Sequence, residues 1–228
     1  YVNDSPHIGH AYTTLACDVL ARFKRLDGFD VKFLTGTDEH GQKVEKSALK
    51  SGVDPQTFTD TVSKNFRDLT KKMNFTNDDF IRTTEKRHKI ASQAIWNKLI
   101  DAGEIYLGSY SGWYSVRDEA FYSETELIIK EDNTKVAPTG AEVEWLEEPS
   151  YFFKLSDWQE RLLDFYDKNP NFILPLTRRN EVISFVKGGL DDLSVSRTSF
   201  KWGIQVPDDS DHIMYVWLDA LTNYLTAV

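Results

Sequence analysis

Apolar residues recur every three to four positions in the first part of the chain, beginning at Ala11. They are Leu15, Val19, Leu20, Phe23 and Leu26, and charged residues fall largely between them. This spacing predicts an amphipathic helix with a single apolar face. Gly28 is the expected stop of that helix.

A short apolar run, Val31–Thr35, follows this helix between Asp30 and Gly36. Its β-branched and aromatic residues predict a buried parallel strand. Ligands bind outside the carboxyl ends of the strands in an open parallel sheet. We therefore expect Asp38, just beyond the strand, and His10, at the start of the helix, to face one crevice.

The pattern changes twice in the rest of the chain. Residues 55–74 and 85–103 are predicted helices, the first opened by Asp54 before Pro55 and the second closed by Gly103. Glycine-punctuated aromatic segments then predict an inserted β-rich module. Within it, the alternation from Glu142 to Glu148 favours a half-buried strand over a cation site. A further helix is expected over 156–168, capped by Ser156.

Composition narrows the class of protein. The chain has 228 residues, 40% hydrophobic and 28% charged, without an apolar run long enough to span a membrane or a secretory leader pattern. A single cysteine, Cys17, excludes an internal disulfide and a multi-cysteine zinc knuckle. The net charge of −9 disfavours nucleic-acid binding by the overall field. We interpret the basic runs 71–72, 86–89 and 178–179 as solvated helix faces and assign them no site.

The most informative motif is His7-Ile8-Gly9-His10, which follows Pro6 where the first helix begins. The first turn of a helix has unpaired backbone N–H groups and a partial positive charge, so phosphate binds there readily. Taken alone, the two histidines are as well explained as cap and packing groups.

Longer segments around the motif resemble a known family. Residues 1–14 resemble the signature of class I aminoacyl-tRNA synthetases in its methionyl version, and residues 35–43 and 215–224 resemble two further segments of the same family. Ser194–Arg197 and Trp202–Ile204 extend the likeness almost from end to end. The resemblance implies an α/β fold: a Rossmann-type parallel sheet forming a nucleotide-binding catalytic domain, with an inserted small β-rich connective module.

The resemblance also implies how the chain is divided. Residues 1–105 would form the first half of the catalytic domain, 106–150 the connective module, and 151–228 the return to the catalytic domain. The family's K-M-S-K-S loop and anticodon-binding domain are missing, so we interpret the chain as an excerpt of a longer protein. Because Gly112–Glu119 holds no cysteine, we expect the variety without structural zinc and assign no metal-binding residue.

Site roles follow from the matched positions. By resemblance, His7 and His10 contact the phosphates of ATP, Gly9 lets adenine approach the backbone, and Arg197 helps to place both substrates. The residues implied in methionine binding are Tyr1, Asp38, Trp217, Ala220 and Tyr224. Simpler interpretations remain open: a tight turn at Gly9, a helix N-cap at Asp38 for the segment beginning near Gly41, a surface ion pair at Arg197, and core packing at Trp217.

The function implied is that of a methionine-tRNA ligase. ATP, accompanied by Mg²⁺, would activate L-methionine as methionyl adenylate, and the methionyl group would pass to tRNA(Met), bound mainly through the missing C-terminal domain. A cytoplasmic location without a membrane partner is expected. Three alternatives stay open: a metal-dependent hydrolase with His7, His10, Asp38 and His40 as ligands, a non-catalytic binding module, and another nucleotidyltransferase acting on a small acid.

Overall fold

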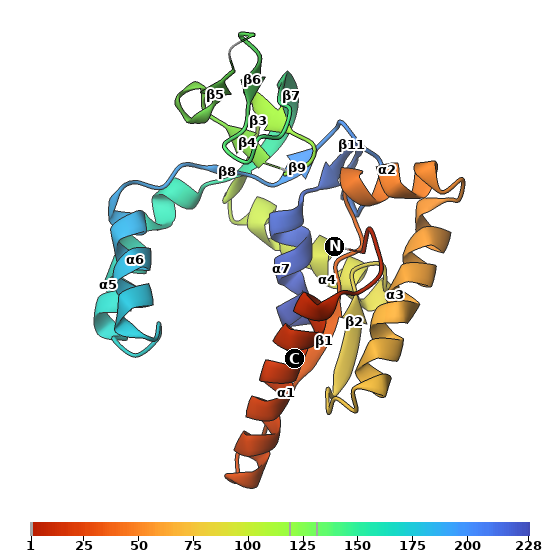
Figure 1. Ribbon diagram of the computed structural model, residues 1–228. Coiled ribbons are helices and arrows are strands. Elements are labelled where there is room, and N and C mark those ends of the chain that lie inside the picture. The colour runs from red at the N-terminus through yellow and green to blue at the C-terminus, as the bar shows by residue number, and fades with distance from the viewer. Residues whose placement is uncertain (1, 119, 131) are drawn as a thin grey trace.

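A computed structural model describes residues 2–118, 120–130 and 132–228, so Tyr1 lies outside the described residues. The N-terminal part alternates helices with two strands. In chain order its elements are α1 (Ile8–Leu26), β1 (Leu34–Thr37), α2 (Gln42–Lys50), α3 (Pro55–Lys72), β2 (Asp79–Arg82) and α4 (Lys86–Asp101). Strands β1 and β2 pair in parallel, with Gly36 opposite Ile81. The parallel strand expected after the first helix is therefore confirmed (Figure 1).

The helix boundaries agree well with the predictions. Asp54 caps α3 by accepting a hydrogen bond from the Thr57 N–H, and Gly103, with φ +71°, follows the end of α4. Gly28, with φ +82°, likewise follows α1. Glycine adopts this left-handed conformation without the steric cost that other residues meet.

Two details differ from the predictions. Strand β1 begins at Leu34 rather than Val31, so residues 31–33 precede the strand. The Ser156 cap is wrong, because Ser156 donates its hydroxyl to Asp192 and a 3₁₀ turn, Leu155–Trp158, leads into α5 (Gln159–Lys168).

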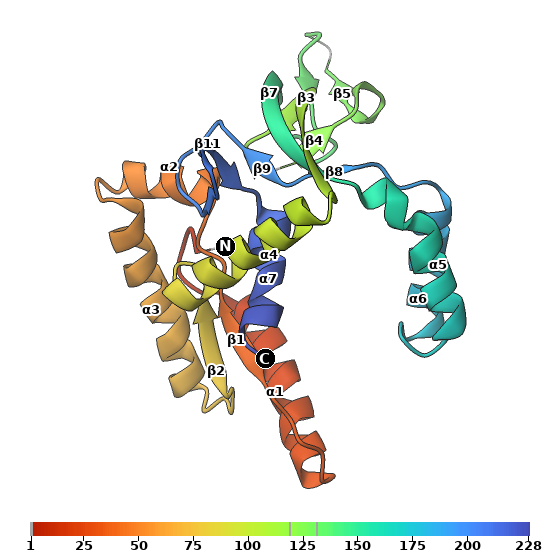
Figure 2. The same cartoon turned by 180° about the vertical axis from the view of Figure 1, so that it is seen from behind.

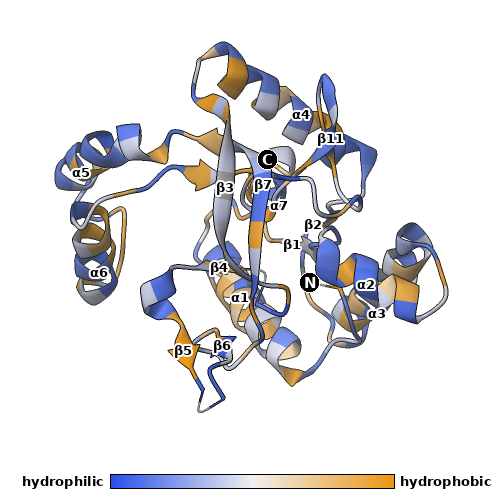
Figure 3. Ribbon diagram, turned by 90° about the horizontal axis from the view of Figure 1, so that it is seen from above, coloured by the Kyte–Doolittle hydropathy of each residue, from blue (hydrophilic) through white to orange (hydrophobic). Residues whose placement is uncertain are grey.

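The middle of the chain is rich in strands, as expected. These are β3 (Ile105–Ser115), β4 (Ala120–Tyr122), β5 (Ile128–Ile129), β6 (Lys135–Val136) and β7 (Glu144–Phe153). The long strands β3 and β7 run antiparallel side by side from Ile105–Phe153 to Tyr114–Glu144 (Figure 3). The alternating acidic segment is thus largely part of a strand, β7, as its pattern predicts.

The last third of the chain ends in a helix, α7 (Val216–Thr226), that packs against α4 of the N-terminal part. A hairpin of α5 and α6 (Leu176–Lys187) projects to one side, as Figures 1 and 2 show, and short strands β8 (Leu193–Ser194), β9 (Ser196–Arg197), β10 (Gln205–Val206) and β11 (Asp209–Met214) lead to α7. None of the helices among the described residues is long and apolar enough to cross a membrane.

A buried apolar cluster holds α7 in place. It joins Leu218 of α7 to Trp96 of α4, Ile105 of β3 and Met214 of β11. Burying such large side chains contributes about 1.5–3 kcal/mol each. The helix that carries Ala220 and Tyr224 is therefore packed against several elements distant in the sequence.

Candidate active site

His7 and His10 hold the first turn of α1 through a reciprocal cap. Nδ1 of His7 accepts the Gly9 backbone N–H at 3.1 Å, and Nδ1 of His10 accepts the His7 backbone N–H at 3.1 Å. The ring centroids lie 3.9 Å apart. The cap interpretation of the two histidines is therefore correct, and it also fixes the direction of each ring.

This cap determines which ring nitrogen can donate. A neutral imidazole that accepts at Nδ1 carries its proton on Nε2. Partial burial lowers the pKa of His10, and the neighbouring His7 lowers it further, which favours the neutral ring. Both rings border a cavity of about 490 Å³, which also reaches Gly9, Thr35 and Asp38. The cap thus leaves Nε2 of each neutral ring as its N–H donor, and both rings border one cavity.

Gly9 lies in this first turn without a left-handed backbone, since it is absent from the positive-φ residues. A Cβ at this position would lie 2.9 Å from Cε1 and 3.0 Å from Nδ1 of the His7 ring. Glycine is therefore needed at position 9 for the space beside His7 rather than for a special backbone conformation.

Asp38 follows β1 in a loop that is fixed on several sides. Its carbonyl accepts the Val2 N–H, and the buried Glu39 beside it receives two hydrogen bonds from Arg82, at 2.7 and 2.9 Å. Trp202 donates its indole N–H to the Glu39 carbonyl at 2.6 Å. Because Gly41 is the N-cap of α2, the N-cap interpretation of Asp38 is wrong.

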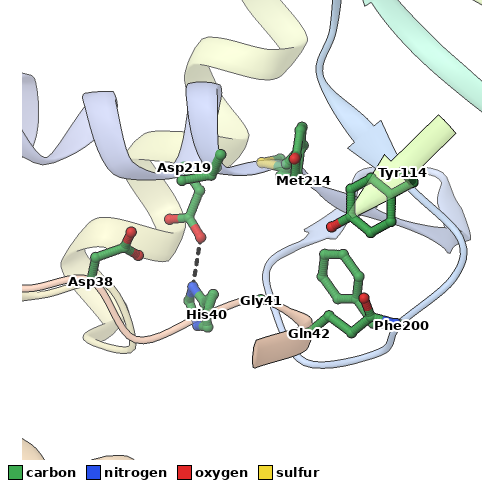
Figure 4. Close-up of a pocket in the computed structure, with 10 residues that line it drawn as sticks. Asp38, His40, Gly41, Gln42, Tyr114, Phe200, Met214 and Asp219 are labelled. Atoms are coloured by element: carbon green, nitrogen blue, oxygen red, sulfur yellow. Dashed lines mark hydrogen bonds and ion pairs between the residues drawn. The ribbon is translucent and has the colours of Figure 1, made fainter. Parts of the chain in front are cut away.

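Three cavities meet at Asp38. It borders the cavity of His7 and His10, and it also borders a second cavity of about 250 Å³ with Ala220 and Tyr224 of α7. The third is a narrow space bordered by His40, Tyr114 and other residues, several of which are labelled in Figure 4. Asp38 and His10 border the same cavity. The expectation that they face one crevice is therefore confirmed.

Two other predicted methionine residues are placed differently. Trp217 is 49% exposed and lines an apolar groove of about 410 Å³ with Leu221 and Leu225, apart from the cavity of Ala220 and Tyr224. Tyr1 lies outside the described residues. The structure therefore brings together Asp38, Ala220 and Tyr224 of the predicted set.

Arg197 is buried, with 1% of its surface exposed, and does not line these three cavities. Its Nε donates to the Glu148 carboxylate, and its guanidinium lies 4.4 Å from the ring centre of Tyr114 and 5.3 Å from that of Tyr215. Both rings line the narrow cavity next to Asp38. The surface ion-pair interpretation is wrong, because both members of the Arg197–Glu148 pair are buried.

The sequence matches the family described as tRNA synthetases class I (M) over residues 1–228. The chain belongs to this class I tRNA synthetase family. Curated relatives include a methionine-tRNA ligase of Rickettsia bellii, 65% identical, and one of Rhizobium meliloti, 59% identical. Each match covers 100% of this chain and 44% of the relative. The chain thus spans less than half the length of these relatives.

Solved structures confirm the α/β catalytic fold of this class I synthetase chain. A Mycobacterium tuberculosis methionyl-tRNA synthetase bound by methionyl adenylate matches with a TM-score of 0.94 and 55% identity. That match covers 100% of this chain and 45% of the other. The free form of the mycobacterial enzyme matches with a TM-score of 0.80 and 51% identity, over 100% and 43% of the two chains.

One cluster in this class I synthetase chain was not found from the sequence. Asp219 of α7 lies between His40 and His88, 2.7 Å from a ring nitrogen of each. The sequence interpretation placed His40 in a possible metal site and His88 in a solvated basic run. Instead His40 pairs with Asp219, and across the described ranges 2–118, 120–130 and 132–228 no three His, Cys, Asp or Glu side chains gather as metal ligands.

Proposed function

We propose that the protein to which this chain belongs is a methionine-tRNA ligase. It would activate L-methionine with ATP and then transfer the methionyl group to tRNA(Met). The observation that carries the proposal is the position of Asp38, at the junction of the His7–His10 cavity and the cavity of Ala220 and Tyr224. A nucleotide in the first and an amino acid in the second would meet at this carboxylate.

The nucleotide half of the proposal depends on the capped helix. The Nε2–H groups of His7 and His10 would donate to phosphate oxygens, and the partial positive charge at the start of α1 favours the same anion. Donors already oriented by hydrogen bonds stabilise charge that develops on the phosphoryl oxygens without reorganising. By the family resemblance, adenine would approach the backbone at Gly9, which borders the same cavity as His7 and His10.

The amino-acid half depends on charge and shape. The Asp38 carboxylate would pair with the α-ammonium group of methionine, while Ala220 and Tyr224 would border its side chain. An aromatic ring suits a polarisable thioether. We assign Arg197 to placing the wall formed by Tyr114 and Tyr215, since the guanidinium lies over both rings. Trp217 and Tyr1 keep their proposed place in methionine selection.

The activation step needs little covalent help from the protein. A carboxylate oxygen of methionine attacks the α-phosphorus of ATP, the bond from that phosphorus to the bridging oxygen breaks, and pyrophosphate leaves with the electron pair. Positioning two anions and neutralising the transferred charge are the main demands. Mg²⁺ would arrive with the phosphates, whose oxygens it prefers as ligands.

The remaining expectations belong to the same proposal. The divisions near residues 105 and 150, a connective module without structural zinc, a cytoplasmic location and tRNA binding mainly by another part of the protein all follow from the family resemblance. The single cysteine, which is exposed at position 17 on α1, supports the expectation about zinc.

The test is amino-acid-dependent exchange of pyrophosphate with ATP by the full-length protein, with each standard amino acid in turn. We expect methionine to support exchange and the others to fail or to act weakly. Exchange with a different amino acid alone would refute the substrate, and methionine binding without exchange would instead identify a non-catalytic binding module.

A variant pair tests the role of His10. His10→Ala removes the Nε2–H donor and should slow exchange about 100-fold, the usual cost of losing one oriented donor. The calorimetric Kd for methionine should stay within about threefold. His10→Gln, which keeps an amide N–H, should lose less activity. Equal losses of exchange and methionine binding in His10→Ala would contradict the assigned role.

A further inference from the structure

The buried cluster of His40, Asp219 and His88 joins three elements that are far apart in the sequence. His40 follows β1, Asp219 lies in the first turn of α7, and His88 belongs to α4. Oδ2 of Asp219 lies 2.7 Å from Nδ1 of His40, and Oδ1 lies 2.7 Å from Nε2 of His88. Figure 4 shows the contact with His40, close to Asp38.

All three side chains are removed from water. Asp219 is 2% exposed, His40 5% and His88 0%. An ionised carboxylate only accepts hydrogen bonds, so both ring nitrogens donate to Asp219. Burial alone would raise the pKa of Asp219, but the charges and hydrogen bonds of His40 and His88 outweigh burial and lower it. The charged carboxylate is therefore the form that the surrounding protein favours.

The cluster connects the two walls of the proposed amino-acid cavity. Asp38 lies two residues before His40 on one wall, and Ala220 follows Asp219 directly on the other. Tyr224 lies on the same helix, about one turn further on. A shift of α7 relative to the Asp38 loop would therefore move Ala220 and Tyr224, which would border the methionine side chain, away from Asp38, which would bind the ammonium group.

We propose that Asp219 is a positioning residue for amino-acid binding, which fixes helix α7 against the Asp38 loop through His40 and against α4 through His88. This inference rests on the proposed function of the site. The nucleotide cavity around His7 and His10 is held by its own local hydrogen bonds. Loosening α7 should therefore weaken methionine binding and leave ATP binding largely unchanged.

The first variant is Asp219→Asn in the full-length protein, measured by methionine-dependent pyrophosphate exchange. Asparagine keeps the size of the side chain but removes the charge that both histidines contact. We expect KM for methionine to rise about tenfold or more, because misplacing a substrate by about 1 Å is enough to cost up to 10²-fold. KM for ATP should stay within about twofold.

The matched control is Asp18→Asn. Asp18 is also a buried carboxylate, 4% exposed, but its partners are Arg22 and the backbone and hydroxyl of Thr76. A comparable fall in the midpoint of thermal unfolding is expected, with both KM values within about twofold of wild type. If Asp18→Asn and Asp219→Asn change KM for methionine equally, the effect is general destabilisation and the positioning role is excluded.

A second pair decides the matter if Asp219→Asn does not fold. His88→Gln places an amide N–H near the position of Nε2 and keeps donation to Asp219, whereas His88→Leu removes it. KM for methionine should stay within about threefold in the glutamine variant and rise about tenfold in the leucine variant. Equal values in the two variants would overturn the inference. A wild-type protein that shows no methionine-dependent exchange would instead overturn the proposed function itself.

Discussion

Gly9→Ala tests whether glycine at position 9 is needed for ATP use, through the position of the His7 ring, or only for the stability of α1. The added Cβ would lie 2.9 Å from Cε1 and 3.0 Å from Nδ1 of the His7 ring. Ordinary contacts begin at about 3.4 Å, so the ring must move by about half an ångström. The moved atom is the acceptor of the Gly9 N–H at 3.1 Å, so the cap hydrogen bond is strained.

The two energetic effects of Gly9→Ala on folding oppose each other. Weakening an N-cap costs about 0.5–2 kcal/mol, while alanine in place of glycine inside a helix gains about 0.5–1 kcal/mol. The net change in the free energy of unfolding should be about 1 kcal/mol or less, which moves the thermal midpoint by only a few degrees. Loss of orientation at His7, together with a methyl group where adenine is proposed to approach the backbone, should lower kcat/KM for ATP tenfold or more. This is equivalent to about 1.4 kcal/mol of transition-state stabilisation.

The assay is methionine-dependent pyrophosphate exchange with ATP varied, alongside thermal unfolding of the full-length protein. Gly28→Ala is the control, because Gly28 has φ +82° and nothing within 4 Å of an added Cβ. It should lose about 1 kcal/mol of stability through backbone strain and keep wild-type kinetics. An unchanged kcat/KM for ATP in Gly9→Ala would refute both the steric argument and the role of this turn.

Three further predictions concern charged groups. Asp38→Ala should raise the calorimetric Kd for methionine at least tenfold, since it removes the carboxylate proposed to pair with the ammonium group; an unchanged Kd would remove Asp38 from the site. Glu148→Gln should lower the free energy of unfolding by about 3–5 kcal/mol, because it leaves Arg197 buried without a counter-charge. Glu181→Gln, which removes one member of an exposed ion pair, should lower it by about 1 kcal/mol or less. Similar thermal midpoints in the two variants would contradict the argument. Burial alone would raise the pKa of Asp18, but hydrogen bonds and an arginine ion pair outweigh it and lower the pKa below its ordinary 3.8. The folded state then binds fewer protons than the unfolded state in this pH range. The wild type should therefore be more stable than Asp18→Asn by its full margin above about pH 3.8, and this margin should disappear as the pH falls through the lowered pKa. A margin that grows on acidification would refute this assignment.

Helix positions were largely predictable because their signals are local. Asp54 caps α3 with its own side chain, and Gly103 ends α4 with its own backbone. The start of β1 was not predictable in this way. The ladder with β2 begins at Leu34, while the N–H of Phe33 is taken by the Asp78 carboxylate. A distant side chain thus sets the boundary within an apolar run that looks uniform in the sequence.

Periodicity predicted α1 but not which surfaces it would bury. Its apolar residues Leu15, Val19, Phe23 and Leu26 are exposed, whereas the charged Asp18 is buried. Asp18 is buried because the loop at Thr76 supplies hydrogen-bond donors to its carboxylate. A hydrophobic pattern predicts that a helix forms, but which of its residues are buried depends on long-range packing.

The predicted site shows the same division between local and long-range information. The reciprocal cap of His7 and His10 spans three residues, so a short motif could reveal it. The contacts of Asp219 with His40 and His88 span 179 and 131 residues, and neither histidine lies in a motif that includes Asp219. The one available signal is a carboxylate inside the otherwise apolar start of α7, which does not identify its partners.

The two proposed substrates would be recognised by groups that are held in different ways, by local contacts in one case and by long-range contacts in the other. The groups proposed to orient a phosphate at the start of α1 are held by neighbouring residues and keep their arrangement as long as the first turn remains helical. Groups around the proposed amino-acid cavity are held by the packing of α7 against α4 and by the hydrogen bonds of Asp219 with His40 and His88, so their arrangement depends on contacts between distant parts of the chain. Substitutions that loosen the core should therefore impair amino-acid selection before they impair nucleotide binding. Asp38 belongs to both parts, because it borders both cavities while its loop is fixed by long-range contacts with Val2, Trp202 and the Arg82–Glu39 pair.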